Sequence, residues 1–228
     1  MRRAKHSPPP PIDGRLVEMA QRAGEAMDQA TKALLDADLA LAEAVIAGDA
    51  ELDEAAALVE EQVFSLISRE HPRDGDLRAL LAGVRISGLL ERMGDLAVHV
   101  AKAARLRYPR SAVPVELRSV IVDMGAVAHK MVEETAGALS KRDAEASTRL
   151  QAMDREMDRL HREMFTIVLS PAWPHGTEAA VDITLISRFY ERFADHAVTI
   201  SKRVAHVVTG EPYVSRHYSQ PDLLPPTT

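Results

Sequence analysis

An acidic motif that occurs twice is the feature of this sequence that most limits how the chain can fold. The segment ERMGD begins at Glu91 and ends at Asp95, and the segment ERFAD begins at Glu191 and ends at Asp195. Residues four apart lie on one face of an α-helix, so each motif would direct two carboxylates to the same side of a helix. The sequence therefore predicts an internal duplication with one acidic site in each half.

A second set of aspartates repeats with the same spacing. Intervals of 11 and 4 residues separate Asp38, Asp49 and Asp53, and the same intervals recur 105 residues later in Asp143, Asp154 and Asp158. The two glutamate–arginine motifs are 100 residues apart, so the second copy is slightly shorter between these markers. Matching spacings at a nearly constant offset predict two copies of a three-helix unit.

Helical periodicity dominates the chain between its two proline-containing ends. Aromatic residues make up only 4% of the sequence, which disfavours a sheet, because strands are enriched in aromatic and β-branched residues. Proline ends several of the helices, since the residue before a proline is displaced from the helical conformation. We predict six helices, over residues 13–36, 38–70, 76–107, 114–141, 143–170 and 177–209.

The predicted fold class is all-α, a tandem duplication of three-helix bundles built from six long antiparallel helices. A Pro-rich extension would occupy residues 1–12, the first three-helix repeat 13–110, the second repeat 111–211 and a tail 212–228. Short connections favour antiparallel neighbours, so two up–down bundles placed end to end are the simplest arrangement.

Composition excludes several classes of protein and site. The formal net charge of −6 argues against a nucleic-acid binder, which needs a basic surface. The chain contains no cysteine, which excludes disulfides, zinc–thiolate sites and iron–sulfur clusters. Basic residues near the start are not followed by an apolar run, and no stretch approaches the roughly eighteen apolar residues of a membrane span. We therefore expect a cytoplasmic protein with no nucleic-acid partner.

Each predicted unit carries two acidic pairs, which bring four carboxylates together if the pairs face each other. The four in the first unit are Asp49, Asp53, Glu91 and Asp95, and the four in the second are Asp154, Asp158, Glu191 and Asp195. Asp49 and Asp154 lie on apolar helix seams, where a carboxylate needs a partner. Sites made of oxygen ligands suit Mg, Ca, Mn or iron, so the pattern indicates a metal site in each unit.

Histidines distinguish the second unit from the first. His196 directly follows Asp195, whereas Leu96 stands at the corresponding place in the first unit. We include His196 among the candidate metal ligands. His161 follows Asp158 by three residues, and the sequence leaves open whether it joins the second site or only packs.

Two alternatives to such a metal site stay open for the acidic pairs. Arg92 and Arg192 follow the motif glutamates and could neutralise the carboxylates by ion pairing, without any metal. A ferritin-like di-metal carboxylate protein is the second alternative, but such sites use Glu-x-x-His on two helices. This sequence has no Glu-x-x-His, and the nearest substitute, Asp158-x-x-His161, has no counterpart in the first unit.

Taken together, these segments resemble the PhoU family, the accessory proteins of phosphate-specific transport. The resemblance rests on LLERMGDLAVHVAKAA (89–104) and YERFADHAVTISKRVAHVVTGE (190–211). It also rests on AGDAELDE (47–54), AMDREMDRLHREMF (152–165) and DLR (76–78). It covers residues 13–211, and the sequence is similar to actinobacterial members in particular.

The resemblance implies a fold of two three-helix bundles and multinuclear metal clusters on the acidic motifs. Iron is the metal it favours, with manganese, zinc or magnesium as alternatives. The carried-over ligands are the motif residues Glu91, Asp95, Glu191 and Asp195, with Asp49, Asp53, Asp154 and Asp158 as their partners on the preceding helices. Leu96 and the Pro-rich extension depart from the family pattern, and Leu96 makes equal metal content in the two clusters doubtful.

The resemblance also implies a regulator with no enzymatic activity. Such a protein would connect the phosphate ABC importer to a sensor histidine kinase, and would act as a negative regulator of the phosphate-starvation response and of phosphate uptake. The expected partners are the kinase and the ATPase subunit of the importer, with peripheral membrane association through them. A homodimer is the expected oligomeric state.

Overall fold

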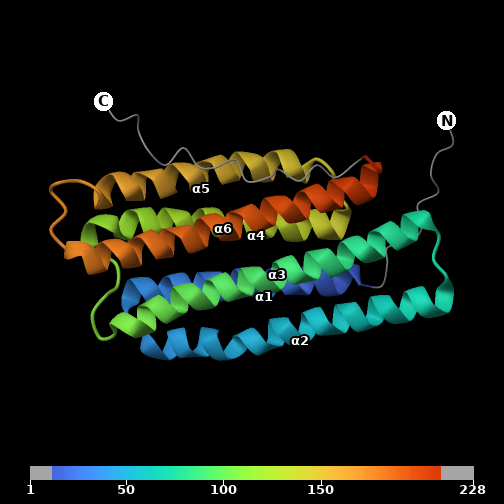
Figure 1. The fold of residues 1–228 in the computed structure, drawn as a ribbon, viewed down its shortest axis with the longest axis horizontal. Coiled ribbons are helices and arrows are strands. Elements are labelled where there is room, and N and C mark those ends of the chain that lie inside the picture. Colours follow the sequence, from blue (N-terminus) through green and yellow to red (C-terminus); the bar gives the residue numbers. More distant parts are fainter. Residues whose placement is uncertain (1–11, 212–228) are drawn as a thin grey trace.

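A computed structural model describes residues 12–211 as an all-α protein, which confirms the predicted fold class (Figure 1). The helices are α1 (Asp13–Asp36), α2 (Leu39–Glu70), α3 (Asp74–Arg107), the short 3-10 helix η1 (Val115–Leu117), α4 (Arg118–Lys141), α5 (Ala146–Val168) and α6 (Gly176–Thr209). The start of the Pro-rich extension and the tail from residue 212 lie outside the described residues. Within the described part of the chain, no helix combines the length and the apolar character that a bilayer span requires.

The turn between the first and second helix of each unit is built in the same way, without glycine or proline. Ala37 and Arg142 are left-handed, with φ of 51° and 53°, and their N–H groups donate to the carbonyls of Ala33 and Ala138. The next residue, an aspartate in both copies, accepts a hydrogen bond from a backbone N–H two or three residues later. The two units therefore share the backbone conformation of this turn as well as the spacing of their acidic residues.

The left-handed turn at Ala37 is strained, so replacing this alanine by glycine is expected to stabilise the protein. A left-handed conformation costs a residue with a Cβ roughly 1–2 kcal/mol, and glycine avoids that cost. We expect Ala37→Gly to raise the free energy of unfolding by about 1 kcal/mol in urea titrations. Ala57→Gly, at an exposed site inside α2, is the matched control and should lower it by about 1 kcal/mol.

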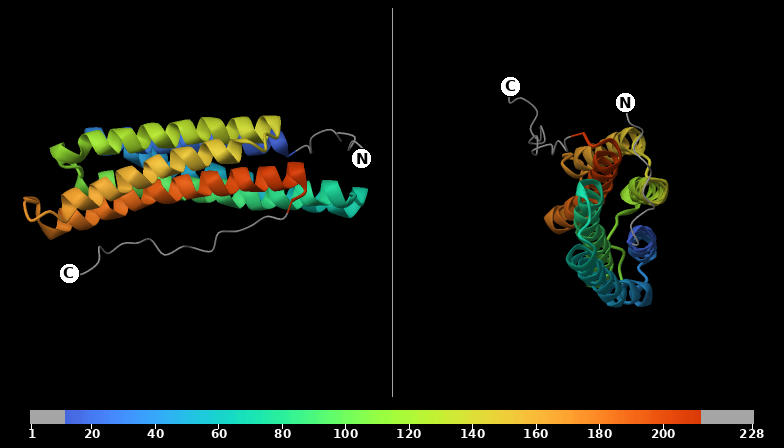
Figure 2. Two further views of the ribbon diagram at one scale, coloured as in Figure 1. Left: turned by 90° about the horizontal axis from the view of Figure 1, so that it is seen from above. Right: turned by 90° about the vertical axis from the view of Figure 1, so that its right-hand side faces the viewer.

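The two three-helix units lie side by side and antiparallel, so the prediction of an end-to-end arrangement is wrong. The main contacts between units join α1 to α4 and α3 to α6. Figure 1 and Figure 2 show α2, α3, α6 and α5 as one layer, with α1 and α4 together on one side of it. The physical reason is burial, because α1, α3, α4 and α6 carry apolar residues that an end-to-end arrangement would leave in water.

Buried polar contacts and ion pairs also join the units. Tyr190 on α6 lies 2.6 Å from the Thr31 hydroxyl on α1, and Thr31 donates its own proton to the carbonyl of Met27. Tyr190 therefore donates to Thr31, and burial raises the pKa of its hydroxyl well above the usual range. Arg107 on α3 binds Asp182 on α6 at 2.5 Å. These contacts fix the register of α1 and α3 against α6.

Candidate functional site

The structure brings the four predicted acidic residues of the first unit together at the α2–α3 contact. We call Asp49, Asp53, Glu91 and Asp95 the first acidic cluster. Burial is the largest cause of the raised pKa of Glu91, and the charges of Asp95, Asp53 and Asp49 raise it further. The pKa of Asp49 is also raised, first by burial and then by Asp95 and Asp53. The four carboxylates thus repel one another across the helix pair.

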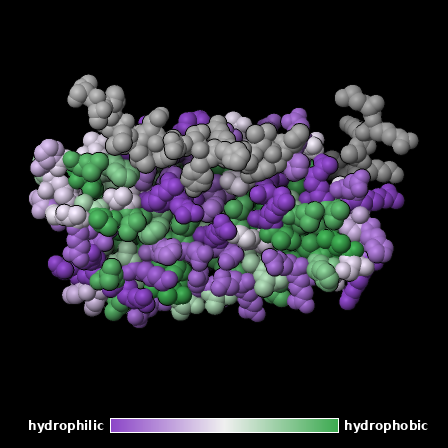
Figure 3. Space-filling model, viewed as in Figure 1, coloured by the Kyte–Doolittle hydropathy of each residue, from purple (hydrophilic) through white to green (hydrophobic). Residues whose placement is uncertain are grey.

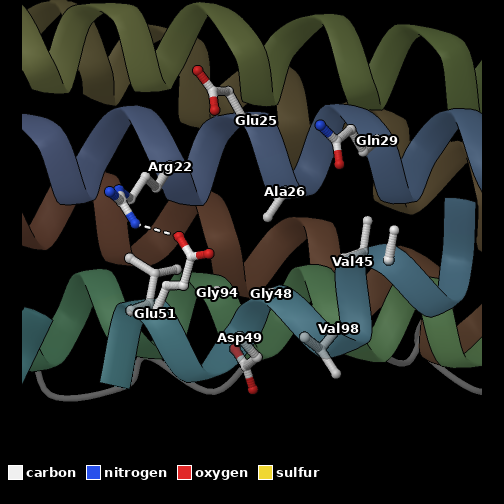
Figure 4. Close-up of a pocket in the computed structure, with 12 residues that line it drawn as sticks. Arg22, Glu25, Ala26, Gln29, Val45, Gly48, Asp49, Glu51, Gly94 and Val98 are labelled. Carbon is white, nitrogen blue, oxygen red and sulfur yellow. Dashed lines mark hydrogen bonds and ion pairs between the residues drawn. The ribbon is translucent and has the colours of Figure 1, made fainter. Parts of the chain in front are cut away.

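Gly94, inside the ERMGD motif, permits the close approach of α2 to α3. A Cβ at this position would lie 2.5 Å from Leu52 Cδ1 and 3.4 Å from Asp49 Oδ1. Figure 4 shows Gly94 and Asp49 in the region where α2 passes α3. The second copy carries Ala194 at this position, together with Met157 in place of Leu52. Methionine is unbranched and adapts to the extra methyl group, so both copies bring their acidic helices together.

A groove of about 260 Å³ lies beside the first acidic cluster, between α1 and α2 (Figure 4). Asp49 and Gly48 line it, and an ion pair of 2.5 Å between Arg22 and Glu51 joins its two sides. Asp49 contributes to the wall of the groove, and in Figure 4 its carboxylate points away from Arg22 and Ala26.

The second acidic cluster consists of Asp154, Asp158, Glu191 and Asp195, at the α5–α6 contact. Burial raises the pKa of Glu191 to about 7, and Asp195, Asp158 and Asp154 add to the increase. Burial also raises the pKa of Asp195, with a contribution from Asp158. The structure therefore brings together the four acidic residues that the sequence assigned to this site.

Arg188 and Glu191 form an ion pair that the sequence analysis did not anticipate. Arg188 Nη1 lies 2.5 Å from Glu191 Oε2 and lowers the pKa of that carboxyl, in opposition to burial. The contact is close but not aligned as a hydrogen bond, and Glu191 Oε2 is a buried oxygen without a hydrogen-bond donor. Gly88 stands where the first copy would carry this arginine. The second cluster is thus more buried than the first and is partly neutralised by its own helix.

His196 faces basic residues in this structure. Burial lowers its pKa to about 4, and the charged neighbours that lower it further are Arg192 and Arg92. Arg92 belongs to α3 of the first unit, so His196 lies at the seam between the units. Leu96, its counterpart, is buried as well. The charge of Arg92 lowers the pKa of Glu91 and that of Arg192 lowers the pKa of Asp195, so both arginines act on the acidic clusters, as the ion-pair alternative expects.

His161 makes a contact that the sequence analysis missed. Its Nδ1 lies 3.0 Å from the hydroxyl of Ser187 on α6, and its ring meets Phe165 edge-on at 4.9 Å. Burial, followed by the charge of Arg188, lowers the pKa of His161 to about 4, so the imidazole is neutral at pH 7. Ser187 is fully buried and cannot act as a nucleophile on an external substrate. The sequence analysis could not predict the His161–Ser187 contact, because the contact depends on the antiparallel register of α5 against α6.

The carboxylate oxygens of the two clusters are ligands that suit a hard cation. The buried Glu191 Oε2 accepts no hydrogen bond but lies 2.5 Å from Arg188 Nη1, so a metal ion at this oxygen would have to displace the guanidinium. Across residues 12–211, the side chains as placed do not gather three His, Asp or Glu donors around one point. Binding of a metal would therefore require carboxylates to rotate toward each other.

Known proteins and a protein-family model match both three-helix units of this chain. The family model described as the PhoU domain matches residues 16–104 and 121–204, one segment in each three-helix unit. The phosphate-specific transport system accessory protein PhoU homolog 2 of Mycobacterium tuberculosis is 43% identical, covering 92% of this chain and 99% of the relative. Homolog 1 of Mycobacterium leprae is 42% identical, covering 92% of this chain and 95% of the relative.

Two solved structures share the fold. PhoU from Pseudomonas aeruginosa aligns with a TM-score of 0.77 at 26% identity, covering 88% of this chain and 96% of that one. The phosphate transport system regulatory protein PhoU from Streptococcus pneumoniae aligns with a TM-score of 0.80, covering 90% of this chain and 96% of that one. Its identity of 22% limits that comparison to the fold.

Proposed function

The chain belongs to the PhoU family, and from that premise we propose that it is an accessory, regulatory protein of phosphate-specific transport. The observation that carries the proposal is the 43% identity to a phosphate-specific transport accessory protein over 92% of the chain. Because the chain belongs to the PhoU family, we prefer this function to that of a ferritin-like di-metal carboxylate protein.

The finer form of the proposal is a cytoplasmic adaptor without enzymatic activity. It would link the importer's ATPase subunit to a sensor histidine kinase, hold the starvation response off and restrain phosphate uptake, acting as a homodimer that reaches the membrane through its partners. Exposed apolar side chains support docking, among them Leu106 on α3, 72% exposed, and Phe64 on α2, 72% exposed. Figure 3 shows apolar groups toward both ends of the face formed by α2, α3, α6 and α5, with mainly hydrophilic groups between them.

Co-purification tests the adaptor role. We expect the protein, isolated from phosphate-replete cells, to retain the sensor kinase and the importer's ATPase subunit, and to lose one or both after phosphate starvation. The apolar surface variant Phe64→Ser, on the exposed side of α2, tests whether that face contributes. Recovery of neither partner under either condition would contradict the proposal.

We propose in addition that both acidic clusters bind metal, with iron favoured by the family resemblance and manganese, zinc or magnesium as alternatives. Burial is the largest cause of the raised pKa values of Asp49, Glu91 and Glu191, and repulsion between neighbouring carboxylates adds to it. The repulsion supports the proposal, because a cation would relieve it. Exposed carboxylates such as Asp53 and Asp158 have room to turn toward a shared ion. A bound metal would neutralise the acidic face and offer a coordination position to a carboxylate or phosphate group of a partner.

Metal content gives the direct test of this second proposal. Protein purified without chelator is expected to contain metal by elemental analysis, and Glu91→Ala combined with Glu191→Ala should remove most of it. Glu60→Ala combined with Glu61→Ala, which removes two exposed acids of α2 outside the clusters, is the matched control. Equal metal in all three proteins would exclude the metal sites while leaving the adaptor role intact.

A further inference from the structure

We propose that one end of the helical bundle docks directly on an anionic lipid surface. This end consists of residues 105–117, where α3 leads into α4, and residues 169–175, where α5 leads into α6, and we call it the loop tip. The tip would lie in the headgroup region without crossing the bilayer, with its apolar side chains at the interface and its arginines against lipid phosphates. The inference rests on the adaptor role proposed above for the presence of a membrane, and it does not depend on metal binding.

Contacts between the two segments make the loop tip one surface. Figure 1 shows both loops at the same end of the bundle. His175 Nε2 in the second segment lies 3.1 Å from Glu116 Oε2 in the first, and Arg107 Nη1 at the end of α3 lies 2.6 Å from Glu178 Oε1 in the first turn of α6. Trp173 Nε1–H donates to the carbonyl of Gly176 at 2.8 Å, which holds the second loop against the start of α6. The side chains of the two loops therefore meet a flat partner together.

Large apolar side chains are concentrated on the loop tip. Among the described residues, three of the four most exposed large hydrophobic side chains lie here: Val115 is 76% exposed, Leu169 75% and Leu106 72%. Tyr108, between Leu106 and Val115 in the chain, is 51% exposed. Single exposed apolar residues are ordinary on a protein surface, but several on adjoining loops mark an interaction site. Tyrosine also suits a membrane interface, because one end of its side chain is apolar and the other is polar.

The charges of the loop tip complement an anionic surface. Its two segments contain three arginines and one acidic residue, whereas the whole chain has a formal net charge of −6. The acid, Glu116, is paired with His175, and Arg107 takes up both Glu178 and Asp182 at the start of α6.

Two arginines are left to attract lipid phosphates. Across residues 12–211, neither Arg105 nor Arg110 forms an ion pair, although the charge of Arg110 lowers the pKa of Glu178. Both side chains are exposed and flank Leu106 and Tyr108 in the chain. An anionic membrane would repel the acidic remainder of the protein and attract this end, so charge also sets the orientation of docking.

The space between the two loops favours a lipid surface over a partner helix. A helix that binds in a groove needs an apolar groove for its apolar face. The hollow between the loops has a volume of about 250 Å³, and polar or charged side chains dominate its lining, among them Arg110, Ser111 and His175. The apolar side chains of the tip thus surround a polar hollow, an arrangement that suits acyl chains beside charged headgroups.

Co-sedimentation of the full-length protein with lipid vesicles tests the inference. We expect binding to vesicles of phosphatidylcholine with phosphatidylglycerol and no binding to vesicles of phosphatidylcholine alone. High salt should weaken the binding, because it screens the attraction between arginines and headgroups. Arg105→Gln combined with Arg110→Gln should weaken it by about tenfold or more.

Apolar variants locate the contact. Leu106→Ser combined with Leu169→Ser should weaken vesicle binding by about tenfold or more, because two apolar side chains no longer enter the interface. Phe64→Ser is the matched control, since Phe64 is also 72% exposed but lies on α2 one turn after the exposed Glu60 and Glu61. It should leave vesicle binding unchanged. Urea unfolding curves of all variants should match the parent, because the replaced side chains are exposed.

The outcomes separate this inference from the adaptor role. Loss of vesicle binding in the tip variants, with the kinase and the importer's ATPase subunit still recovered in co-purification, would support direct lipid docking. Absence of binding to anionic vesicles in the parent protein would overturn the inference and leave the adaptor role intact. The inference would also fail if Phe64→Ser abolished binding and the tip variants did not. Tip variants that keep vesicle binding but lose the kinase or the ATPase subunit would make the tip a protein-docking surface, which likewise contradicts the inference.

Discussion

Replacing Gly24 by alanine is expected to lower the free energy of unfolding by about 2 kcal/mol, although Gly→Ala in a helix is ordinarily stabilising. Gly24 lies where α1 crosses α4 of the other unit. A Cβ there would be 2.5 Å from Val132 Cγ1, 3.1 Å from Val132 Cβ and 3.2 Å from Val132 Cγ2. Valine is rigid at χ1 and Val132 is buried, so it cannot turn away and the two helices must separate. Urea titration at constant pH measures the loss.

Two companion variants isolate this steric effect. Gly137→Ala, in α4 with no atom within 4 Å of the added Cβ, should stabilise the protein by up to about 1 kcal/mol. Val132→Ala removes the obstructing methyl groups, so the double variant Gly24→Ala/Val132→Ala should be more stable than the sum of the single effects predicts. Strict additivity, or stabilisation by Gly24→Ala alone, would show that α1 and α4 do not pack at this distance.

Glu191→Gln is expected to stabilise metal-free protein at pH 8 by about 2 kcal/mol and to have little effect below pH 4.5. The pKa of Glu191 is about 7 in the folded protein, above the ordinary value of 4.5, mainly because the carboxyl is buried. The folded state therefore binds more protons than the unfolded state between these two values. The stabilising contribution of the protonated Glu191 is fully present below pH 4.5 and is lost as pH rises through 7. The Glu191→Gln variant does not show this loss, because glutamine cannot ionise.

Unfolding curves in EDTA at pH 4.5, 6 and 8 would measure this difference. Glu91→Gln is the matched variant in the first unit, where the pKa of the carboxyl is also raised by burial and neighbouring acids. It should show the same sign with a smaller effect, because Glu91 lacks the deeper burial of Glu191. A Glu191→Gln variant that is no more stable than the parent at pH 8 would mean that the buried carboxylate is already compensated, for example by Arg188.

Much of the fold was predictable because the signals are local or repeated. Helical periodicity and proline located the helices, and the recurring aspartate and glutamate spacings identified the duplication. The turns at Ala37 and Arg142 carried no glycine or proline, and only the duplication indicated them. Their left-handed conformation depends on capping hydrogen bonds. The conformational preference of each amino acid taken alone does not predict these bonds.

The candidate site was predictable in its carboxylates and less so in its other side chains. All eight acidic residues lie in the two clusters because residues four apart share a helix face in any helix. The histidine chosen from sequence adjacency, His196, lies beside Arg92 and Arg192, because the next residue along a helix points about 100° away. The contacts of Glu191 with Arg188 and of His161 with Ser187 depend on tertiary packing or rotamer choice.

The sequence by itself determined that this protein is a duplicated helical chain with an acidic pair on each of four helices, since periodicity and spacing need no knowledge of distant contacts. Only the tertiary structure decided that the two units lie side by side, because their apolar seams are satisfied by each other. It also decided that the two clusters are unequal. Packing buries Glu191, which pairs with Arg188 on its own helix, whereas the first unit has Gly88 at the position of this arginine.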